Sequence, residues 1–125
     1  MEIYVYYLGA ILLVVIGIAH SYLGERYILI RLFRTDGLPK LYGGTAFTKN
    51  TLRFAWHLTT VAWFGFAFVL IHLSDDSLSE NVIGNIIAFT FIVHGIVSLV
   101  GSKGRHFSWP LFFTIGIAVL YASNT

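Results

Sequence analysis

At 125 residues the chain has the length of one domain, and 57% of its residues are hydrophobic while 11% are charged, against about one quarter charged in soluble domains. Because so short a chain cannot bury that much apolar surface in a core of its own, we expect an integral membrane protein covered by lipid. The absence of cysteine excludes disulfides and thiolate metal sites, and a net charge of only +2 without any nucleic-acid-binding motif indicates no nucleic-acid partner.

The first predicted element is a membrane-spanning helix over residues 3–23. No charged residue interrupts this stretch, and about 20 apolar residues are enough to cross the hydrocarbon layer of a bilayer. Tyr4, Tyr6 and Tyr7 stand near its start, where aromatic side chains are typical of the lipid–water interface. We therefore expect the first span to be anchored at that end by its tyrosines.

Residues 24–50 form the one long polar connection. Its first part, 25–34, interleaves three arginines with apolar residues, which favours an amphipathic helix in the membrane interface or a continuation of the first span. Asp36, Gly37 and Pro39 then break any helix. We predict an interfacial amphipathic helix after the first span.

Three further apolar stretches follow, separated by an acidic turn at 74–81 and a basic turn at 102–107. Each is long enough, or nearly so, to cross a bilayer. The predicted spans are about 3–23, 52–73, 82–101 and 108–122. The sequence thus predicts an all-α fold, an up-and-down bundle of four transmembrane helices forming a single domain over 1–125.

The positive charges predict the orientation of this bundle. All eight Lys and Arg residues fall in or beside the 24–50 and 102–107 loops, whereas both termini and the 74–81 loop carry only acidic charges. A bias of Lys and Arg near span ends marks the cytoplasmic side. We therefore expect these two loops to be cytoplasmic and both termini to lie outside a bacterial inner membrane.

Three histidines are predicted to share one depth in the cytoplasmic leaflet. At about 1.5 Å per helical residue, His20, His57 and His94 lie roughly 5 to 10 Å inside the cytoplasmic boundary. His72 lies near the opposite face and cannot join them. Because ionisable residues inside a membrane are functional candidates by default, the three form a candidate site.

A haem b group is the first hypothesis for this site. Two imidazoles from facing helices can ligate the iron, which would suit electron transfer. Arg53 and Arg105 would then pair with the haem propionates at the membrane surface. Arg53, one turn from His57, in any case favours an anionic neighbour such as Glu25 or a cofactor carboxylate.

A divalent metal ion is the second hypothesis, with His20, His57 and His94 as ligands and Glu25 as a fourth. Glu25 lies five residues after His20, about 140° around an ideal helix, so Gly24 would have to break the helix. The positive charge of Arg53 also opposes a bound cation.

Other hypotheses remain open on the sequence alone. The chain is also compatible with a small, oligomeric transporter or channel that uses histidine protonation as a switch, or with a scaffold subunit without chemistry. In a purely structural interpretation, His20 and His57 extend to the membrane interface or bond to backbone carbonyls, and His94 bonds to the carbonyl of Thr90 or to a neighbouring helix. No enzyme motif is present, and the sequence does not decide whether the chain is an enzyme.

Overall fold

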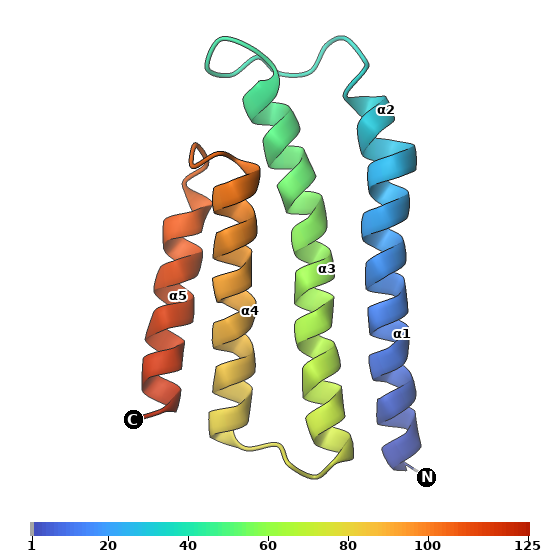
Figure 1. The fold of residues 1–125 in the computed structure, drawn as a ribbon, viewed down its shortest axis with the longest axis vertical. Helices are drawn as coiled ribbons and strands as arrows, with labels where there is room; N and C mark the ends of the chain where they lie inside the picture. The colour runs from blue at the N-terminus through green and yellow to red at the C-terminus, as the bar shows by residue number, and fades with distance from the viewer. Residues whose placement is uncertain (1) are drawn as a thin grey trace.

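The computed structural model describes residues 2–125 and contains no β-strand in that range, which confirms the predicted all-α class. Its four long helices run alternately up and down (Figure 1). They are α1 (Glu2–Leu23), α3 (Ala46–Ser74), α4 (Glu80–Gly101) and α5 (Ser108–Ser123). The π-helix η1 (Gly24–Leu29) and the short α2 (Ile30–Leu32) follow α1.

Three of the helices are long and apolar enough to cross a membrane. These are the continuous helix Glu2–Leu32 with 31 residues, Ala46–Ser74 with 29 and Glu80–Gly101 with 22. Ser108–Ser123 is also apolar, but its 16 residues extend over about 24 Å, less than the roughly 30 Å of a hydrocarbon layer.

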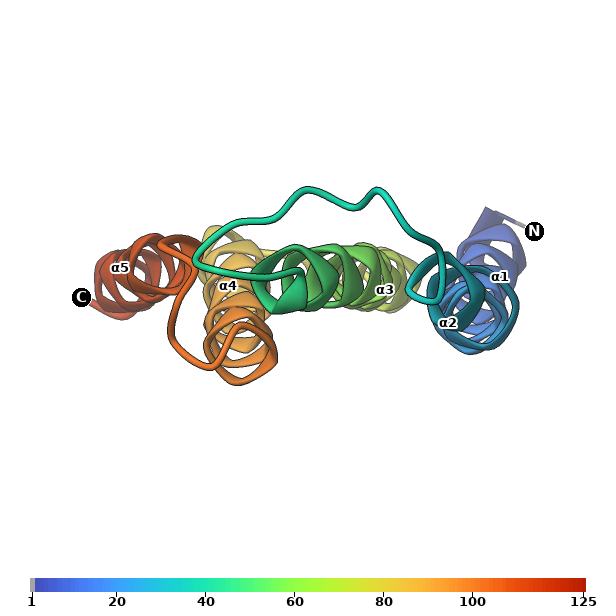
Figure 2. The same cartoon turned by 90° about the horizontal axis from the view of Figure 1, so that it is seen from above.

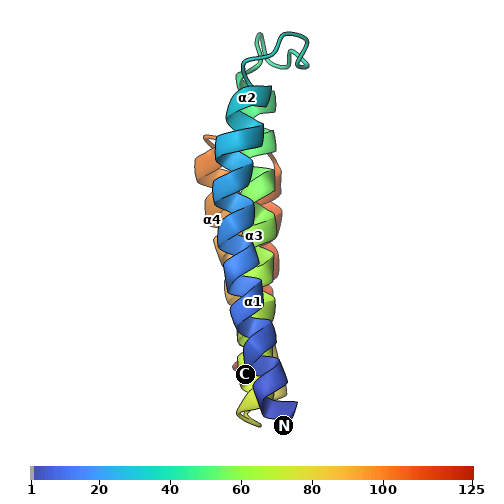
Figure 3. The same cartoon turned by 90° about the vertical axis from the view of Figure 1, so that its right-hand side faces the viewer.

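The long helices lie in an open row in the order α1, α3, α4, α5 (Figure 2). In this row α3 packs against α1 and α4, and α4 packs against α5, while within residues 2–125 α1 contacts neither α4 nor α5. Seen from its edge, the row is a narrow layer (Figure 3). The predicted up-and-down order is therefore present, but the helices do not close into a compact bundle.

Few apolar side chains are buried in this layer. The buried ones are Ala10, Leu29, Phe54, Ala67 and Ala88, whereas large apolar side chains are exposed along every long helix. A soluble monomer rarely exposes so much contiguous apolar surface. The exposure agrees with a lipid surrounding, which the composition predicted.

Glycines permit the close contacts between neighbouring helices. A Cβ atom added to Gly24 would overlap the indole ring of Trp56 on α3, and one added to Gly116 would lie 2.9 Å from the carbonyl oxygen of Ala88 on α4. Small residues at such points let helices approach closely in membranes.

The segment after the first span differs from the predicted interfacial helix. Gly24 does not break the helix; η1 and α2 carry α1 onward to Leu32 along the side of α3 (Figure 1). Packing against α3 explains this continuation, because the side chain of Leu29 is buried and Glu25 pairs with Arg53 of α3. Accordingly α3 begins at Ala46, earlier than the predicted start near residue 52.

Candidate functional site

A row of polar side chains joins the first helix to α3 near the end that carries the basic loops. Ser21 and Glu25 come from α1 and η1, and Arg53, His57 and Thr60 come from α3. Residues three or four positions apart share one face of a helix. The two helices therefore present matching polar faces to each other, and we call these five side chains the polar chain.

An ion pair forms the outer end of the polar chain. Nη2 of Arg53 lies 2.8 Å from Oε1 of Glu25, and Nε of Arg53 donates to both carboxylate oxygens at 2.9 and 3.2 Å. Two donors from one guanidinium fix the orientation of the carboxylate. This contact confirms the prediction that Arg53 has an anionic neighbour, with Glu25 as that neighbour.

His57 connects the ion pair to hydroxyl groups further inside. Its Nε2 lies 3.2 Å from Oε2 of Glu25, and its Nδ1 lies 2.9 Å from Oγ of Ser21. Oγ of Ser21 lies 2.6 Å from Oγ1 of Thr60, which donates to the carbonyl oxygen of Gly17 at 3.0 Å. A continuous series of hydrogen bonds thus runs from a partly exposed ion pair to the buried Thr60.

A groove with a volume of about 640 Å³ opens beside the polar chain. Its lining combines the polar side chains with apolar ones from α1, α2 and α3: Ile18, Ser21, Tyr22, Glu25, Arg26, Ile30, His57, Thr60 and Phe64. Glu25 and His57 therefore line an open groove on the surface of the helix row.

His20 makes a different, reciprocal contact with α3. Its ring stacks parallel to the Trp56 indole with the ring centroids 4.6 Å apart, and its Nε2 lies 3.2 Å from the Trp56 carbonyl oxygen. The Trp56 indole N–H in turn donates to the carbonyl of His20 at 2.9 Å. The contact of His20 with a backbone carbonyl is the one that the structural interpretation expects.

His94 lies at the contact between α4 and α5. Its Nδ1 is 2.7 Å from the carbonyl oxygen of Thr90, and its ring packs against Phe91 and Phe112. Of the two structural partners considered for His94, the hydrogen bond is to the carbonyl of Thr90. Within residues 2–125 no group of three or more His, Asp or Glu side chains is placed to hold a metal ion.

The cofactor hypotheses fit these contacts poorly. Both ring nitrogens of His57 are engaged by Ser21 and Glu25, and the Glu25 carboxylate is engaged by Arg53. A haem iron or a metal ion would have to displace these partners. Arg105, the second predicted propionate partner, is an exposed residue in the turn between α4 and α5. The structure gives no support to a haem or metal site at these residues.

Ser21 and Thr60 were not predicted to be linked to His57. A signal for them exists in the sequence, because Ser21 lies four residues before Glu25 and Thr60 three residues after His57, on the same helix faces. The predicted grouping of the histidines starts from their common depth, and depth does not say which neighbouring helix a side chain meets.

No protein-family model, no curated protein and no solved structure matches the chain. The function is therefore argued from the geometry of the polar chain and its surroundings.

Proposed function

We propose that the chain is a small integral membrane protein of a bacterial inner membrane in which all four long helices span the bilayer. The short α5 packs along α4 and exposes Tyr121 near its end, as an interfacial anchor would. The basic loops lie on the cytoplasmic side, since all eight Lys and Arg residues gather in or beside them.

Within this protein, His57 is the proton-exchanging group of a small transporter. The observation that carries this proposal is the position of its ring, which bridges the carboxylate of Glu25 and the hydroxyl of Ser21 across two helices. Imidazole is the side chain that ordinarily changes its charge near neutral pH. A change in the protonation of His57 is therefore a change in the contact between α1 and α3.

The effect of protonation is inferred from the donors and acceptors that each group offers. When both nitrogens of His57 carry protons, Nε2 donates to Glu25 and Nδ1 donates to Ser21. Ser21 then donates to Thr60, which itself donates to the carbonyl of Gly17. Every hydrogen bond in this series then has one donor and one acceptor. The side chains of Glu25, His57, Ser21 and Thr60 all have hydrogen-bond partners.

Loss of one proton from His57 interrupts this order. If Nδ1 is the nitrogen that loses its proton, it needs a donor, and Ser21 must turn its hydroxyl toward the ring and away from Thr60. The contact between the Ser21 and Thr60 hydroxyls then has no hydrogen between its two oxygens, because the Thr60 hydroxyl already donates its hydrogen to the carbonyl of Gly17. Deprotonation thus weakens the α1–α3 contact at its buried end.

Proton movement in proteoliposomes tests the proposal. Vesicles containing the protein and an internal pH indicator receive a pH gradient, and a panel of cationic, neutral and anionic organic compounds is added outside. We expect at least one class to discharge the gradient, and we expect His57→Gln to slow the initial rate about tenfold or more.

His94→Gln is the matched control. It alters a histidine of similar depth, and an amide can still donate to the Thr90 carbonyl, so its rate should stay within about twofold of the wild type. The proposal fails if no compound discharges the gradient with the wild-type protein, or if His57→Gln transports as fast as His94→Gln.

A further inference from the structure

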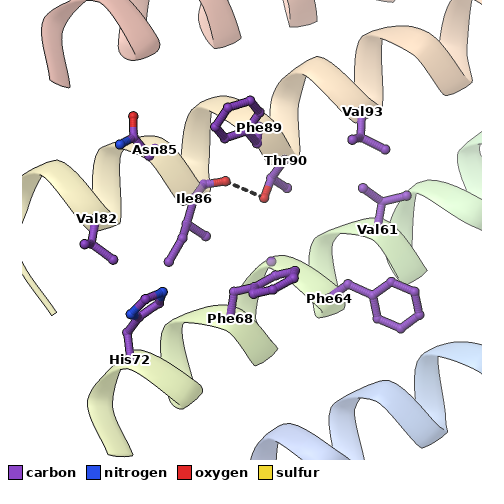
Figure 4. A pocket seen from close by; sticks show the side chains of 11 residues that line it. Val61, Phe64, Phe68, His72, Val82, Asn85, Ile86, Phe89, Thr90 and Val93 are labelled. Carbon is purple, nitrogen blue, oxygen red and sulfur yellow. Dashed lines mark hydrogen bonds between the residues drawn. The ribbon is translucent and has the colours of Figure 1, made fainter. Parts of the chain in front are cut away.

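A second groove, with a volume of about 580 Å³, lies between α3 and α4. Figure 4 shows Phe68 and His72 of α3 on the side of that helix that faces α4. The lining residues are Val61, Phe64, Gly65, Phe68, His72, Val82, Asn85, Ile86, Phe89, Thr90 and Val93. This volume falls in the range of sites that hold drug-sized molecules.

The inside of this groove is apolar, although Thr90 lines it. The Thr90 hydroxyl donates to the Ile86 carbonyl at 2.6 Å, a bond that Figure 4 marks, so it offers no free donor. Phe64, Phe68 and Phe89 provide aromatic surface instead. An occupant is therefore held mainly by apolar and aromatic contacts.

The end of the groove near the α3–α4 turn lies beside an acidic segment of the chain, although no acidic side chain lines the groove itself. His72 and Val82 both line the groove, and the chain between them carries Asp75, Asp76 and Glu80 but no Lys or Arg. A one-signed set of charges beside a low-dielectric cleft raises the local concentration of counter-ions. This end attracts cations and repels anions.

We propose that the groove binds lipophilic organic cations and that they are the substrates of the transporter, an assignment of substrate class that rests on the proposed function. Cations are attracted to the faces of aromatic rings, most strongly where water is excluded. Aromatic walls and acidic charges at one end are the combination that favours a delocalised cation over a neutral lipid chain or an anion.

The two sites share a helix and one side chain. Phe64 lines both the α3–α4 groove and the groove beside the polar chain, and Val61 lies one turn from His57. A displacement of α3 relative to α1 on deprotonation of His57 therefore moves one wall of the cation site. This connection gives the proton a physical route to influence the bound cation.

Equilibrium binding of tetraphenylphosphonium tests the cation site. The protein is placed in nanodiscs of zwitterionic lipid at constant pH, and empty nanodiscs give the partition baseline for each probe. Tetraphenylborate, an anion of nearly the same shape, is the second probe. We expect saturable binding of the cation above the baseline and no saturable binding of the anion.

Two phenylalanines on α3 provide a matched pair of variants. Phe68 lines the groove and is 57% exposed, whereas Phe66 is 61% exposed and does not line it. Phe68→Ala should weaken cation binding about tenfold, and Phe66→Ala should change it less than about twofold. Because both side chains are exposed, neither truncation opens the core.

A double variant, Asp76→Asn with Glu80→Gln, tests the contribution of the acidic residues in the α3–α4 turn. Asn tolerates the positive φ of 52° at position 76. The double variant should weaken cation binding about threefold at low salt and reduce its dependence on salt concentration.

Equal saturable binding of the cation and the anion would overturn the assignment, and so would equal effects of Phe68→Ala and Phe66→Ala. His94→Gln should retain cation binding, because His94 lines neither groove. Cation binding is measured without any proton gradient, which separates this test from that of the proposed function. Binding without proton movement would refute proton coupling and leave the cation site in place. Proton movement without cation binding would refute the cation site alone.

Discussion

At the scale of single residues, the ion pair between Glu25 and Arg53 is the contact with the clearest energetic signature. Both side chains are partly exposed, at 29% and 42%, so solvent screens their attraction and the pair contributes modestly. Glu25→Gln and Arg53→Gln should each destabilise the protein. The double variant should be less destabilised than the sum of the two, with a coupling of about 0.5–1 kcal/mol.

Chemical unfolding in detergent micelles measures this coupling. Glu80→Gln paired with Arg53→Gln is the control, because these residues lie at opposite ends of the molecule and their effects should add. Additive effects of Glu25→Gln and Arg53→Gln would mean that the ion pair does not stabilise the contact between η1 and α3.

The same scale shows what the sequence could tell about the site. The depth of His20, His57 and His94 follows from the rise of a helix and needs no other information. The direction in which each of these side chains points does not follow from the helix rise, because packing partners set the rotation of each helix about its axis. His57 meets Glu25, His20 meets Trp56 and His94 meets α5, so one predicted cluster is three separate environments.

At the scale of helices, Gly116 on α5 shows how closely two helices pack without a core of large side chains. A Cβ atom there would lie 2.9 Å from the Ala88 carbonyl oxygen and 3.0 Å from the Ile92 nitrogen. Backbone atoms cannot rotate away, so Gly116→Ala must push α5 from α4. We expect a net loss of stability of about 1–2 kcal/mol, after the better helix propensity of alanine is counted.

Gly44→Ala is the control for this substitution. No atom lies within 4 Å of a Cβ added at Gly44, and its φ is not positive, so its stability should change by less than about 0.5 kcal/mol. Thermal unfolding of both variants in the same detergent compares them. A Gly116→Ala protein as stable as Gly44→Ala would show that α5 adjusts freely.

The helices themselves could be predicted because long apolar runs identify spanning helices without reference to tertiary structure. The start of α3 and the arrangement of the helices could not be predicted in this way. Residues 46–51 include polar side chains that lower the hydropathy, although α3 already begins at Ala46. The open row was missed because lipid and protein interiors are equally apolar, so hydrophobicity does not mark which faces meet.

At the scale of the whole molecule, the charges divide the protein into two ends of opposite sign. The end with the 33–45 and 102–107 loops holds all eight Lys and Arg residues, and the other end holds both termini and the acidic turn after α3 (Figure 1). The polar chain lies toward the first end, and the proposed cation groove extends from the middle of α3 and α4 to His72 and Val82 near the second. The two proposed sites therefore lie at different depths of the helix row.

This division predicts the orientation, and the absence of cysteine allows a direct test. Lys40→Cys and Glu80→Cys each introduce a single thiol at an exposed position, one at either end. A membrane-impermeant maleimide added to intact bacterial cells should label Glu80→Cys at once. Lys40→Cys should react only after the membrane is permeabilised, because Lys and Arg keep their loops in the cytoplasm.

The labelling pattern also assigns the two proposed sites to sides of the membrane. With Glu80 outside, the proposed proton site at His57 lies toward the cytoplasm, and the end of the proposed cation groove at His72 lies toward the outer leaflet. Labelling of Lys40→Cys but not Glu80→Cys in intact cells would place each site on the other side of the membrane. It would contradict the orientation assigned from the distribution of Lys and Arg. Equal labelling of both thiols in intact cells would mean that the chain inserts in two orientations, and neither site would then have a fixed side.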